Sequence, residues 1–345
     1  MSRRPEAERS DWTDLDLLTR QEAYGRLQEE ITETGTRLAE LGDSDEAERG
    51  LLEARLRALR EAAGDLTDNA TTEVVMGRVQ GKVALITGAA RGQGRSHAVR
   101  LAEEGADVVV TDVCHDISDA LPYPLASKEE LDETVELVRA TGRRCVAVQA
   151  DVRSVTEVRA AVDAARAEFG RLDIVVANAG VMSSGSAWEL SEEAWDVVVD
   201  VNLKGAWNTA RAAIPWLIEA GAGGSIIMIS SAAGIRGHVP YAHYVASKHG
   251  VVGLMKALSN ELAPHRIRVN TVHPTGVSDT GISVGVPVEE LAAREPLFAL
   301  AAMNPLAPYV EPRDVSNAVL FLASDEGRYV TGLQFTVDAG STNKP

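Results

Sequence analysis

One glycine-rich segment indicates the fold of this chain: Thr87-Gly88-Ala89-Ala90-Arg91-Gly92-Gln93-Gly94. It directly follows the apolar run VALIT (83–87), and a helical pattern begins at its last glycine. In such a turn, backbone N–H groups and the helix N-terminus can hold a pyrophosphate. A lone glycine pattern would also fit a tight turn, but the strand before it and the helix after it indicate dinucleotide binding. The cofactor contacts assigned here are Gly88, Arg91, Gly92, Gln93 and Gly94.

Beyond this turn, short apolar runs alternate with amphipathic helical patterns. Near-continuous apolar strands are typical of a parallel sheet that is covered on both faces. The series predicts an α/β, doubly wound Rossmann fold with a seven-stranded parallel sheet. Strands are predicted at 83–87, 107–112, 145–149, 173–178, 225–230, 267–272 and 333–338, and helices at 94–105, 128–141, 154–169, 191–219, 244–263 and 312–324.

The composition excludes several classes of function. The chain has 345 residues and is 45% hydrophobic, which is enough to bury a sizeable core. Its 34 Lys and Arg against 51 Asp and Glu give a net charge of −17, which repels nucleic acid and anionic lipid. Cys114 and Cys145 make neither a disulfide framework nor a zinc site, and no metal site is predicted. Without a secretory signal or an apolar spanning run, we expect a cytoplasmic protein.

Residues 1–76 differ in kind from residues 77–345, and we divide the chain there. The first part holds 10 arginines, no lysine and 19 acidic residues. Thr19 to Glu22 has the pattern of a capping box that opens a helix, which Gly42 would end. A second helix is predicted from Asp43 or Ser44 to Gly64, which makes an antiparallel helical hairpin.

The hairpin carries one apolar stripe on each helix. Two helices this short bury too little to be stable alone, so they need a surface to pack on. That surface is the body of the protein, a sister subunit or another partner. We favour packing within the homo-oligomer, and a solvated extension that frays is the alternative. The stripes are Leu27, Ile31, Leu38 and Leu41 on the first helix, and Leu52, Leu56, Leu59 and Ala63 on the second.

Asp112 stands at the end of the second predicted strand. A carboxylate there accepts hydrogen bonds from the ribose hydroxyls of an adenosine and repels a 2′-phosphate. The position therefore favours NAD over NADP. Arg91 is a mild counter-signal, since a cation near the turn helps a 2′-phosphate, but it does not remove the repulsion from Asp112.

Tyr244 and Lys248 are four residues apart on a predicted helix and share one face, and Ser231 follows the predicted strand 225–230. A free tyrosine, with a pKa of about 10, is a poor base at neutral pH. Lys248 and an oxidised nicotinamide are two positive charges that favour the phenolate, which can then take the proton of an alcohol. Ser231 would orient the substrate oxygen. Each residue taken singly has an ordinary structural interpretation, but together they predict alcohol oxidation.

With these motifs, residues 78–341 resemble the short-chain dehydrogenase/reductase family. The family's TGxxxGxG motif corresponds to Thr87–Gly94, its YxxxK motif to Tyr244–Lys248, and its active-site serine to Ser231, thirteen residues before the tyrosine. The resemblance implies that the asparagine of VNLKG joins them through a water held by its backbone. The implied catalytic tetrad is Asn202, Ser231, Tyr244 and Lys248.

The resemblance also implies further cofactor contacts. Asp151 and Val152 look like the pair that contacts adenine, and Asn178-Ala179-Gly180 like the segment that lines the cofactor after the fourth strand. After the sixth strand, Val277 is expected to contact the carboxamide through its backbone. Thr280 is also assigned to the cofactor, although it falls one residue later than is usual in the family. The implied cofactor site further includes Tyr244 and Lys248.

A narrower resemblance is to the mycofactocin-coupled subgroup, which is related to carveol dehydrogenases. It rests on the segments 86–114, 244–254 and 268–277 and on the long insert CHDISDALPYPLASKEELDETVELV (114–138). In that subgroup the insert folds over the bound NAD, which is not readily exchanged and is reoxidised by a redox partner. A Pro-containing loop next to Asp112 is well placed to act as a cover, and the alternative is a surface insertion without catalytic consequence.

The expected substrate is a small lipophilic secondary alcohol or its ketone. The segment 281–308 is rich in Ala, Leu, Met and Pro, including Leu300 and Met303, and offers an apolar lid without a cation cluster for a carboxylate or phosphate. His238 and His243 are expected to shape the pocket wall.

Similar enzymes pair two long helices, here about 191–219 and 244–263, and form homotetramers. An exchangeable-NAD(P) ketoreductase is the alternative, and a non-catalytic NAD-sensing protein is disfavoured because the tetrad is intact.

Overall fold

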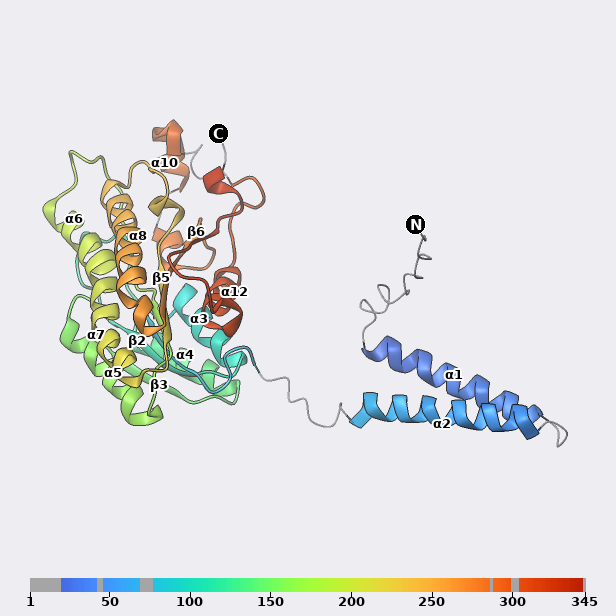
Figure 1. Ribbon diagram of the computed structural model, residues 1–345. Coiled ribbons are helices and arrows are strands. Elements are labelled where there is room, and N and C mark those ends of the chain that lie inside the picture. The colour runs from blue at the N-terminus through green and yellow to red at the C-terminus, as the bar shows by residue number, and fades with distance from the viewer. Residues whose placement is uncertain (1–19, 42–45, 69–76, 286–287, 299–303, 344–345) are drawn as a thin grey trace, which may run out of the picture. The chain divides into compact units, whose positions relative to one another are not determined.

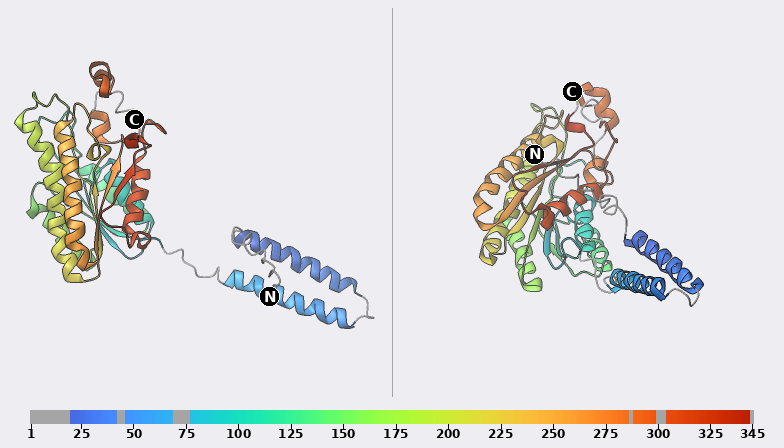
Figure 2. Two further views of the ribbon diagram at one scale, coloured as in Figure 1. Left: turned by 45° about the horizontal axis from the view of Figure 1, so that its top comes forward. Right: turned by 45° about the vertical axis from the view of Figure 1, so that its right-hand side comes forward.

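The computed structural model describes residues 20–41, 46–68, 77–285, 288–298 and 304–343 of the chain. It divides into two compact units, Met1–Val75 and Met76–Pro345. The larger unit is a sheet between two layers of helices (Figures 1 and 2). Among the described helices, none has an apolar stretch of the length that a membrane crossing needs.

All seven predicted strands are present, and they form one parallel sheet in the order β3-β2-β1-β4-β5-β6-β7. The doubly wound fold is therefore confirmed. In the pairing of the first strand with its two neighbours, Thr87 lies beside Thr111 and Ile86 lies beside Val176. The strands are β1 (Val83–Thr87), β2 (Asp107–Asp112), β3 (Cys145–Gln149), β4 (Ile174–Ala177), β5 (Gly224–Ile229), β6 (Ile267–Pro274) and β7 (Gln334–Val337).

Each face of the sheet is covered by its own layer of helices, because alternate residues of a strand point to opposite faces. Leu85 and Ile86, both fully buried, belong to the two separate apolar cores that result. The layers are α3 (Gly92–Glu103), α4 (Lys128–Ala140) and α12 (Pro312–Ala323) on one face, and α5 (Val155–Phe169), α7 (Gly205–Ala220) and α8 (Ala242–Leu262) on the other (Figure 1).

The predicted helix 191–219 is one run with an irregular centre. It consists of α6 (Glu192–Val199), a π-helical turn η3 (Asp200–Lys204) and α7. Asn202 lies in this turn, and its side chain bonds to the backbone of Val181 rather than remaining on the helix surface. π-bulges of this kind interrupt α-helices mostly at functional sites.

Short helices accompany these elements at the carboxyl edge of the sheet and at the chain's turns. The segment 281–298, predicted only as an apolar lid, forms two of them, and Leu300 and Met303 of that prediction lie outside the described residues. These elements are η4 (Ala232–Gly234), η5 (Ala263–His265), α9 (Gly281–Gly285), α10 (Val288–Arg294), η6 (Asp325–Gly327) and η7 (Ser341–Asn343).

The smaller unit contains the helices α1 (Arg20–Glu40) and α2 (Glu46–Asp68). Thr34 of α1 and Leu56 and Ala63 of α2 are buried within it, and Arg55 forms an ion pair with Glu30 at 3.2 Å. The prediction that Gly64 ends the second helix is wrong, because the helix continues to Asp68. A glycine within a helix costs only about 1 kcal/mol relative to alanine, and four helix-compatible residues follow it. Thr19 and the predicted turn Gly42–Ser44 lie outside the described residues.

Three glycines set the path of the chain between β1 and α3. Gly88 and Gly92 have positive φ angles of 65° and 56°, which residues other than glycine rarely adopt. A Cβ at Gly94 would lie 2.0 Å from the carbonyl oxygen of Gly88. The loop therefore packs backbone against backbone, and the strand-to-helix turn depends on these positions.

We predict that Gly94→Ala lowers the free energy of unfolding of the larger unit by about 2 kcal/mol or more, because the added methyl overlaps a backbone carbonyl that cannot rotate away. Denaturant unfolding followed by tryptophan fluorescence measures this. The control is Gly50→Ala in α2, where no atom lies within 4 Å of the added Cβ, and this variant is expected to leave the unfolding of the larger unit unchanged. Equal stability of Gly94→Ala and the wild type would show that the loop does not have this close packing.

Candidate active site

A cleft of about 840 Å³ lies at the carboxyl ends of the strands, where β1 and β4 lead to opposite sides of the sheet. Ligands of open α/β sheets bind at such a switch point. Every residue that the sequence assigned to the cofactor lines this cleft. That set is Gly88, Arg91, Gly92, Gln93, Gly94, Asp112, Asp151, Val152, Asn178, Gly180, Tyr244, Lys248, Val277 and Thr280.

The glycine loop leaves polar groups at one end of the cleft. Helix α3 begins at Gly92, and the first N–H groups of a helix have no partner within it. The side-chain oxygen Oε1 of Gln93 is buried and has no hydrogen-bond partner among the described residues. Asn178 ties β4 to this loop, because its Nδ2 donates to the carbonyl oxygens of Thr87 at 2.9 Å and Gly88 at 3.1 Å. Asn178 thus fixes the loop, whose helix N–H groups can bind an anion and whose Gln93 oxygen can accept a hydrogen bond from a donor.

Asp112 ends β2 beside this loop. Its Oδ2 accepts from the N–H of Ala90 at 3.0 Å and its Oδ1 from that of Val113 at 2.8 Å. Burial raises the pKa of the carboxyl, and the two N–H donors oppose that rise. Each oxygen retains a second lone pair, so the carboxylate can still accept hydrogen bonds from a ligand.

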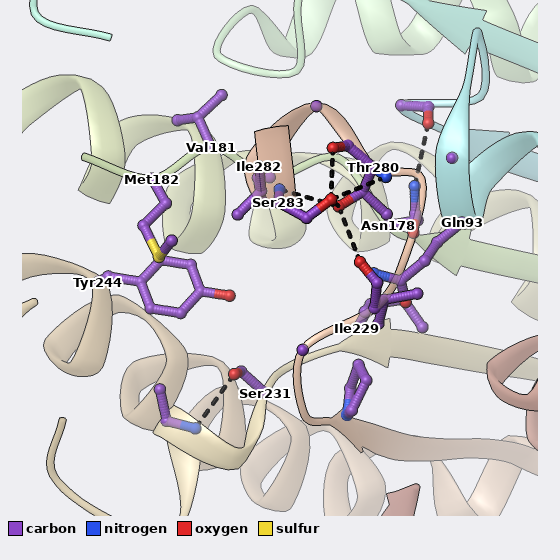
Figure 3. Close-up of a pocket in the computed structure, with 18 of the residues that line it drawn as sticks. Gln93, Asn178, Val181, Met182, Ile229, Ser231, Tyr244, Thr280, Ile282 and Ser283 are labelled. Carbon is purple, nitrogen blue, oxygen red and sulfur yellow. Dashed lines mark hydrogen bonds between the residues drawn. The ribbon is translucent and has the colours of Figure 1, made fainter. Parts of the chain in front are cut away.

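Tyr244 and Lys248 lie together on α8, as the four-residue spacing predicted. Tyr244 and Ser231 both line the cleft (Figure 3). The Lys248 ammonium is 5.6 Å from the centroid of the Tyr244 ring, and it donates to the carbonyl of Ile229 at 2.9 Å. Burial lowers the pKa of Lys248 to about 8. Burial also raises the pKa of Tyr244, while the nearby Ser231 hydroxyl acts in the opposite direction. A cation beside a buried phenol favours the ionised form of that phenol.

Ser231 and Asn202 complete the group. Ser231 caps η4, where its Oγ accepts from the N–H of Ala233 at 3.1 Å, so its own proton remains available for donation. Asn202 Oδ1 accepts from the N–H of Val181 at 2.8 Å, and its Nδ2 donates to Ser247 Oγ at 3.1 Å. A Cβ at Gly180 would lie 3.4 Å from both Asn202 Oδ1 and Lys248 Nζ. Three residues of the predicted tetrad, Ser231, Tyr244 and Lys248, therefore line one end of the cleft, and Asn202 is buried behind it beside Gly180.

Val277 and Thr280 follow β6, and both line the cleft. The bridge between Val277 and Val310 uses the backbone groups of Gly276 and Ser278, so it does not engage the N–H of Val277. Thr280 Oγ1 donates to the carbonyl oxygen of Val277 at 3.3 Å. Thr280 also lies near the glycine loop, since its Cγ2 is 3.3 Å from the place of a Cβ on Gly92.

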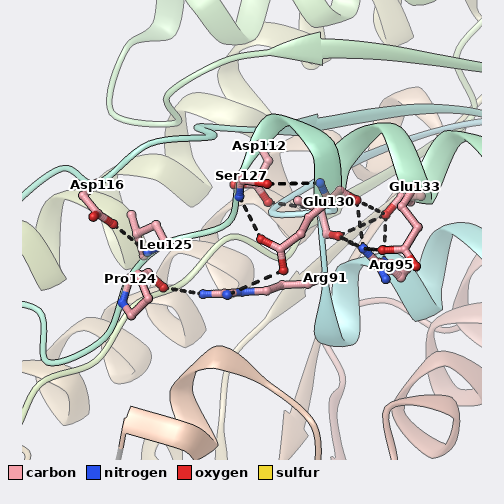
Figure 4. A network of polar contacts seen from close by, with 11 residues as sticks. Arg91, Arg95, Asp112, Asp116, Pro124, Leu125, Ser127, Glu130 and Glu133 are labelled. Carbon is pink, nitrogen blue, oxygen red and sulfur yellow. Dashed lines mark hydrogen bonds and ion pairs between the residues drawn. The ribbon is translucent and has the colours of Figure 1, made fainter.

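Residues of the insert after β2 line the cleft, and Figure 4 shows Pro124 of the insert beside Arg91 of the glycine loop. Arg91 of the glycine loop donates to the carbonyl oxygen of Pro124 at 2.6 Å, and Asp116 Oδ1 accepts from the N–H of Leu125 at 2.7 Å. On the other side, the Tyr123 hydroxyl accepts a hydrogen bond from the N–H of Met182 at 2.9 Å. The insert is thus tied both to the loop after β1 and to the loop after β4.

Three further tyrosines, none of them assigned individually from the sequence, also line the cleft: Tyr123, Tyr241 and Tyr309. Tyr123 makes its contact with a backbone group 59 residues away, which no local pattern reveals. Tyr241 lies three residues before Tyr244, a spacing that places both on one helix face and could have identified it.

The two histidines expected in the pocket wall differ. His238 lines the cleft, whereas His243 is buried behind it with its Nε2 at 2.8 Å from Ser183 Oγ. Among the described lining residues, the cations are Arg91 and Lys248. The end of the cleft around Met182, Tyr241, Leu291 and Phe298 is an apolar cluster. It suits an uncharged ligand.

Comparison with known proteins gives consistent matches. Residues 88–342 match the adh_short_C2 family model, described as enoyl-(acyl carrier protein) reductase. The (−)-trans-carveol dehydrogenase of Rhodococcus erythropolis is 49% identical over 278 residues, which cover 78% of this chain and 100% of that protein.

Two solved structures are also similar to this chain in sequence and in fold. Carveol dehydrogenase from Mycobacterium avium, in complex with NAD, is 46% identical with a TM-score of 0.72, covering 78% of this chain and 100% of that one. A short chain dehydrogenase from Mycobacterium paratuberculosis, bound to NAD, is 45% identical with a TM-score of 0.74 and the same coverage. With these matches over the whole larger unit, the chain belongs to the short-chain dehydrogenase/reductase family.

Proposed function

We propose that the protein is an NAD-dependent oxidoreductase that interconverts a lipophilic secondary alcohol and its ketone. The observation that carries this proposal is the meeting of Tyr244, Lys248 and Ser231 at the end of a cleft whose other end is a glycine cradle. The similar carveol dehydrogenases and the NAD-bound structure from Mycobacterium avium support it.

The residues of the cleft fit NAD. The cradle is too tight for a Cβ at Gly94, and the buried Gln93 Oε1 lacks a protein partner, as expected where a polar ligand binds. Asp112 would hold the adenosine ribose and repel a 2′-phosphate, which selects against NADP. When bound, NAD supplies a nicotinamide ring that exchanges a hydride with the substrate. The N–H of Val277 and the side chains of Tyr244 and Lys248 would hold this end of it.

Tyr244 acts as the acid and base. In alcohol oxidation its phenolate takes the hydroxyl proton of the substrate, and in ketone reduction its phenol returns that proton. Ser231 orients the substrate oxygen with its free proton, and the charge of Lys248 favours the phenolate. Asn202 connects Lys248 to solvent through a water, as the family resemblance implies.

The substrate occupies the apolar end of the cleft. Met182, Ala292 and Phe298 provide a surface for a hydrocarbon skeleton, and a carboxylate or phosphate would find no cation there among the described lining residues. A terpenoid alcohol such as carveol is therefore a suitable first substrate, given the similarity to carveol dehydrogenases.

The insert would hold NAD tightly. Its bonds from Arg91 to Pro124 and from Met182 to Tyr123 must open before a dinucleotide beneath it can leave. Bound NAD would then be reoxidised by a redox partner of the mycofactocin type. If the insert opens readily, the protein is an ordinary dehydrogenase with exchangeable cofactor.

The assembly is proposed to be a cytoplasmic homotetramer. The α6–α7 run and α8 would form its helical interfaces, as the family resemblance implies. The acidic hairpin of α1 and α2 would pack within this oligomer, because a two-helix unit of this size gains stability from a further surface.

We predict that Tyr244→Phe lowers kcat for alcohol oxidation by about 10²- to 10⁴-fold, the usual contribution of a positioned acid or base. NADH binding should change by less than about twofold, since the lost oxygen is only a minor part of the contact with the cofactor. Absorbance assays with carveol and fluorescence titration with NADH measure the two quantities. Unchanged turnover would contradict the assigned mechanism.

We predict that Tyr123→Phe speeds release of bound NADH by about 10-fold, because the Met182 N–H loses its acceptor and the insert loses one of its ties. Stopped-flow displacement of NADH by excess NAD measures the rate. The control is Tyr329→Phe, at a tyrosine that is 88% exposed outside the cleft. An unchanged rate in Tyr123→Phe would mean that the insert does not retain the cofactor.

A further inference from the structure

Tyr241 is held in a fixed position at the start of α8. It is 5% exposed and lines the cleft, three residues before Tyr244. Its backbone forms a bridge with Gly185, whose N–H donates to the carbonyl of Pro240 at 3.0 Å. The ring of Phe298 packs edge-on against its ring, with centroids 6.1 Å apart. The phenol therefore cannot swing freely toward solvent.

The hydroxyl of Tyr241 is buried without a hydrogen-bond partner in the described part of the chain. Native proteins leave few buried polar atoms unpaired, and each such atom calls for an explanation. Seven side-chain atoms of the described residues are in this state, and only those of Gln93 and Tyr241 belong to residues that line the cleft.

These two atoms belong to opposite ends of the cleft. Gln93 lies in the glycine cradle, where NAD would give its oxygen a partner. Tyr241 lies in the apolar cluster with Met182, Leu291 and Phe298, where the substrate would bind. The same reasoning that assigns the first atom to the cofactor assigns the second to the substrate.

The chemistry of Tyr241 limits what it can recognise. Burial raises its pKa, and the neighbouring Tyr244 adds to the rise, so the hydroxyl stays protonated and neutral. A neutral hydroxyl in an apolar setting suits an uncharged acceptor, because a carboxylate or phosphate would be buried without a cation.

We propose that Tyr241 donates a hydrogen bond to a second oxygen of the substrate, a carbonyl, ether or epoxide, away from the reacting hydroxyl. The substrate class is then a lipophilic secondary alcohol with one further uncharged oxygen. This inference rests on the proposed function and makes Tyr241 a specificity residue rather than part of the hydride-transfer chemistry.

The test compares alcohols that differ only in that oxygen. One pair is 4-methoxycyclohexanol and 4-ethylcyclohexanol, and a longer pair is a 3-hydroxysteroid with and without a 17-oxo group. In at least one pair, wild-type kcat/KM should favour the oxygen-bearing member, and Tyr241→Phe should lower kcat/KM for that member by about 10-fold or more. The carbon analogue should change by less than about twofold, and Tyr329→Phe should change neither.

Two further results bear on the proposal. The melting temperature of free Tyr241→Phe should equal or exceed that of the wild type, because the variant removes a buried unpaired oxygen. A clear fall would show that the hydroxyl has a partner within the protein and would overturn the proposal. So would wild-type turnover without discrimination in either pair, or an equal loss for both members in Tyr241→Phe. If the wild type oxidises no alcohol of either pair, the proposed function fails and this inference falls with it.

Discussion

The close packing of the glycine loop against the start of α3 and the end of β4 is the constraint on which the site depends. A Cβ at Gly88 would lie 2.7 Å from the Cα of Ala179, and one at Gly94 would lie 2.0 Å from the carbonyl oxygen of Gly88. These contacts bring the ends of β1 and β4 together at the point where the strand order reverses. The crevice that results lies among the carboxyl ends of the strands, so residues far apart in sequence meet there.

Burial then determines the chemistry of this crevice. It lowers the pKa of Lys248 to about 8 and raises that of Tyr244, because both charged forms lose water. The ordinary pKa values of a lysine amine and a tyrosine phenol are nearly equal, and the two shifts move them apart, so that burial favours the neutral form of each group. The nearby Ser231 hydroxyl and the positive charge of an oxidised nicotinamide act against this effect and favour the phenolate. The acid and base chemistry of this crevice therefore depends both on burial and on the charge that is bound in it.

Much of the fold followed from local sequence patterns, because buried parallel strands must be apolar throughout. The seven runs became the seven strands, and the spacing of Tyr244 and Lys248 correctly placed both on one face of α8. The features that the sequence did not predict depend on contacts between distant residues or on small differences in free energy. The bond between Tyr123 and Met182 joins two loops, and the extension of α2 past Gly64 reflects a penalty of only about 1 kcal/mol.

The central claim is that the cleft holds NAD and rejects NADP through Asp112. The most direct test is native mass spectrometry of the full chain after incubation with equal concentrations of NAD and NADP. The two adducts differ in mass by one phosphate and are read in the same spectrum. Each subunit is expected to carry NAD. A spectrum dominated by NADP, or by protein without nucleotide, would contradict it.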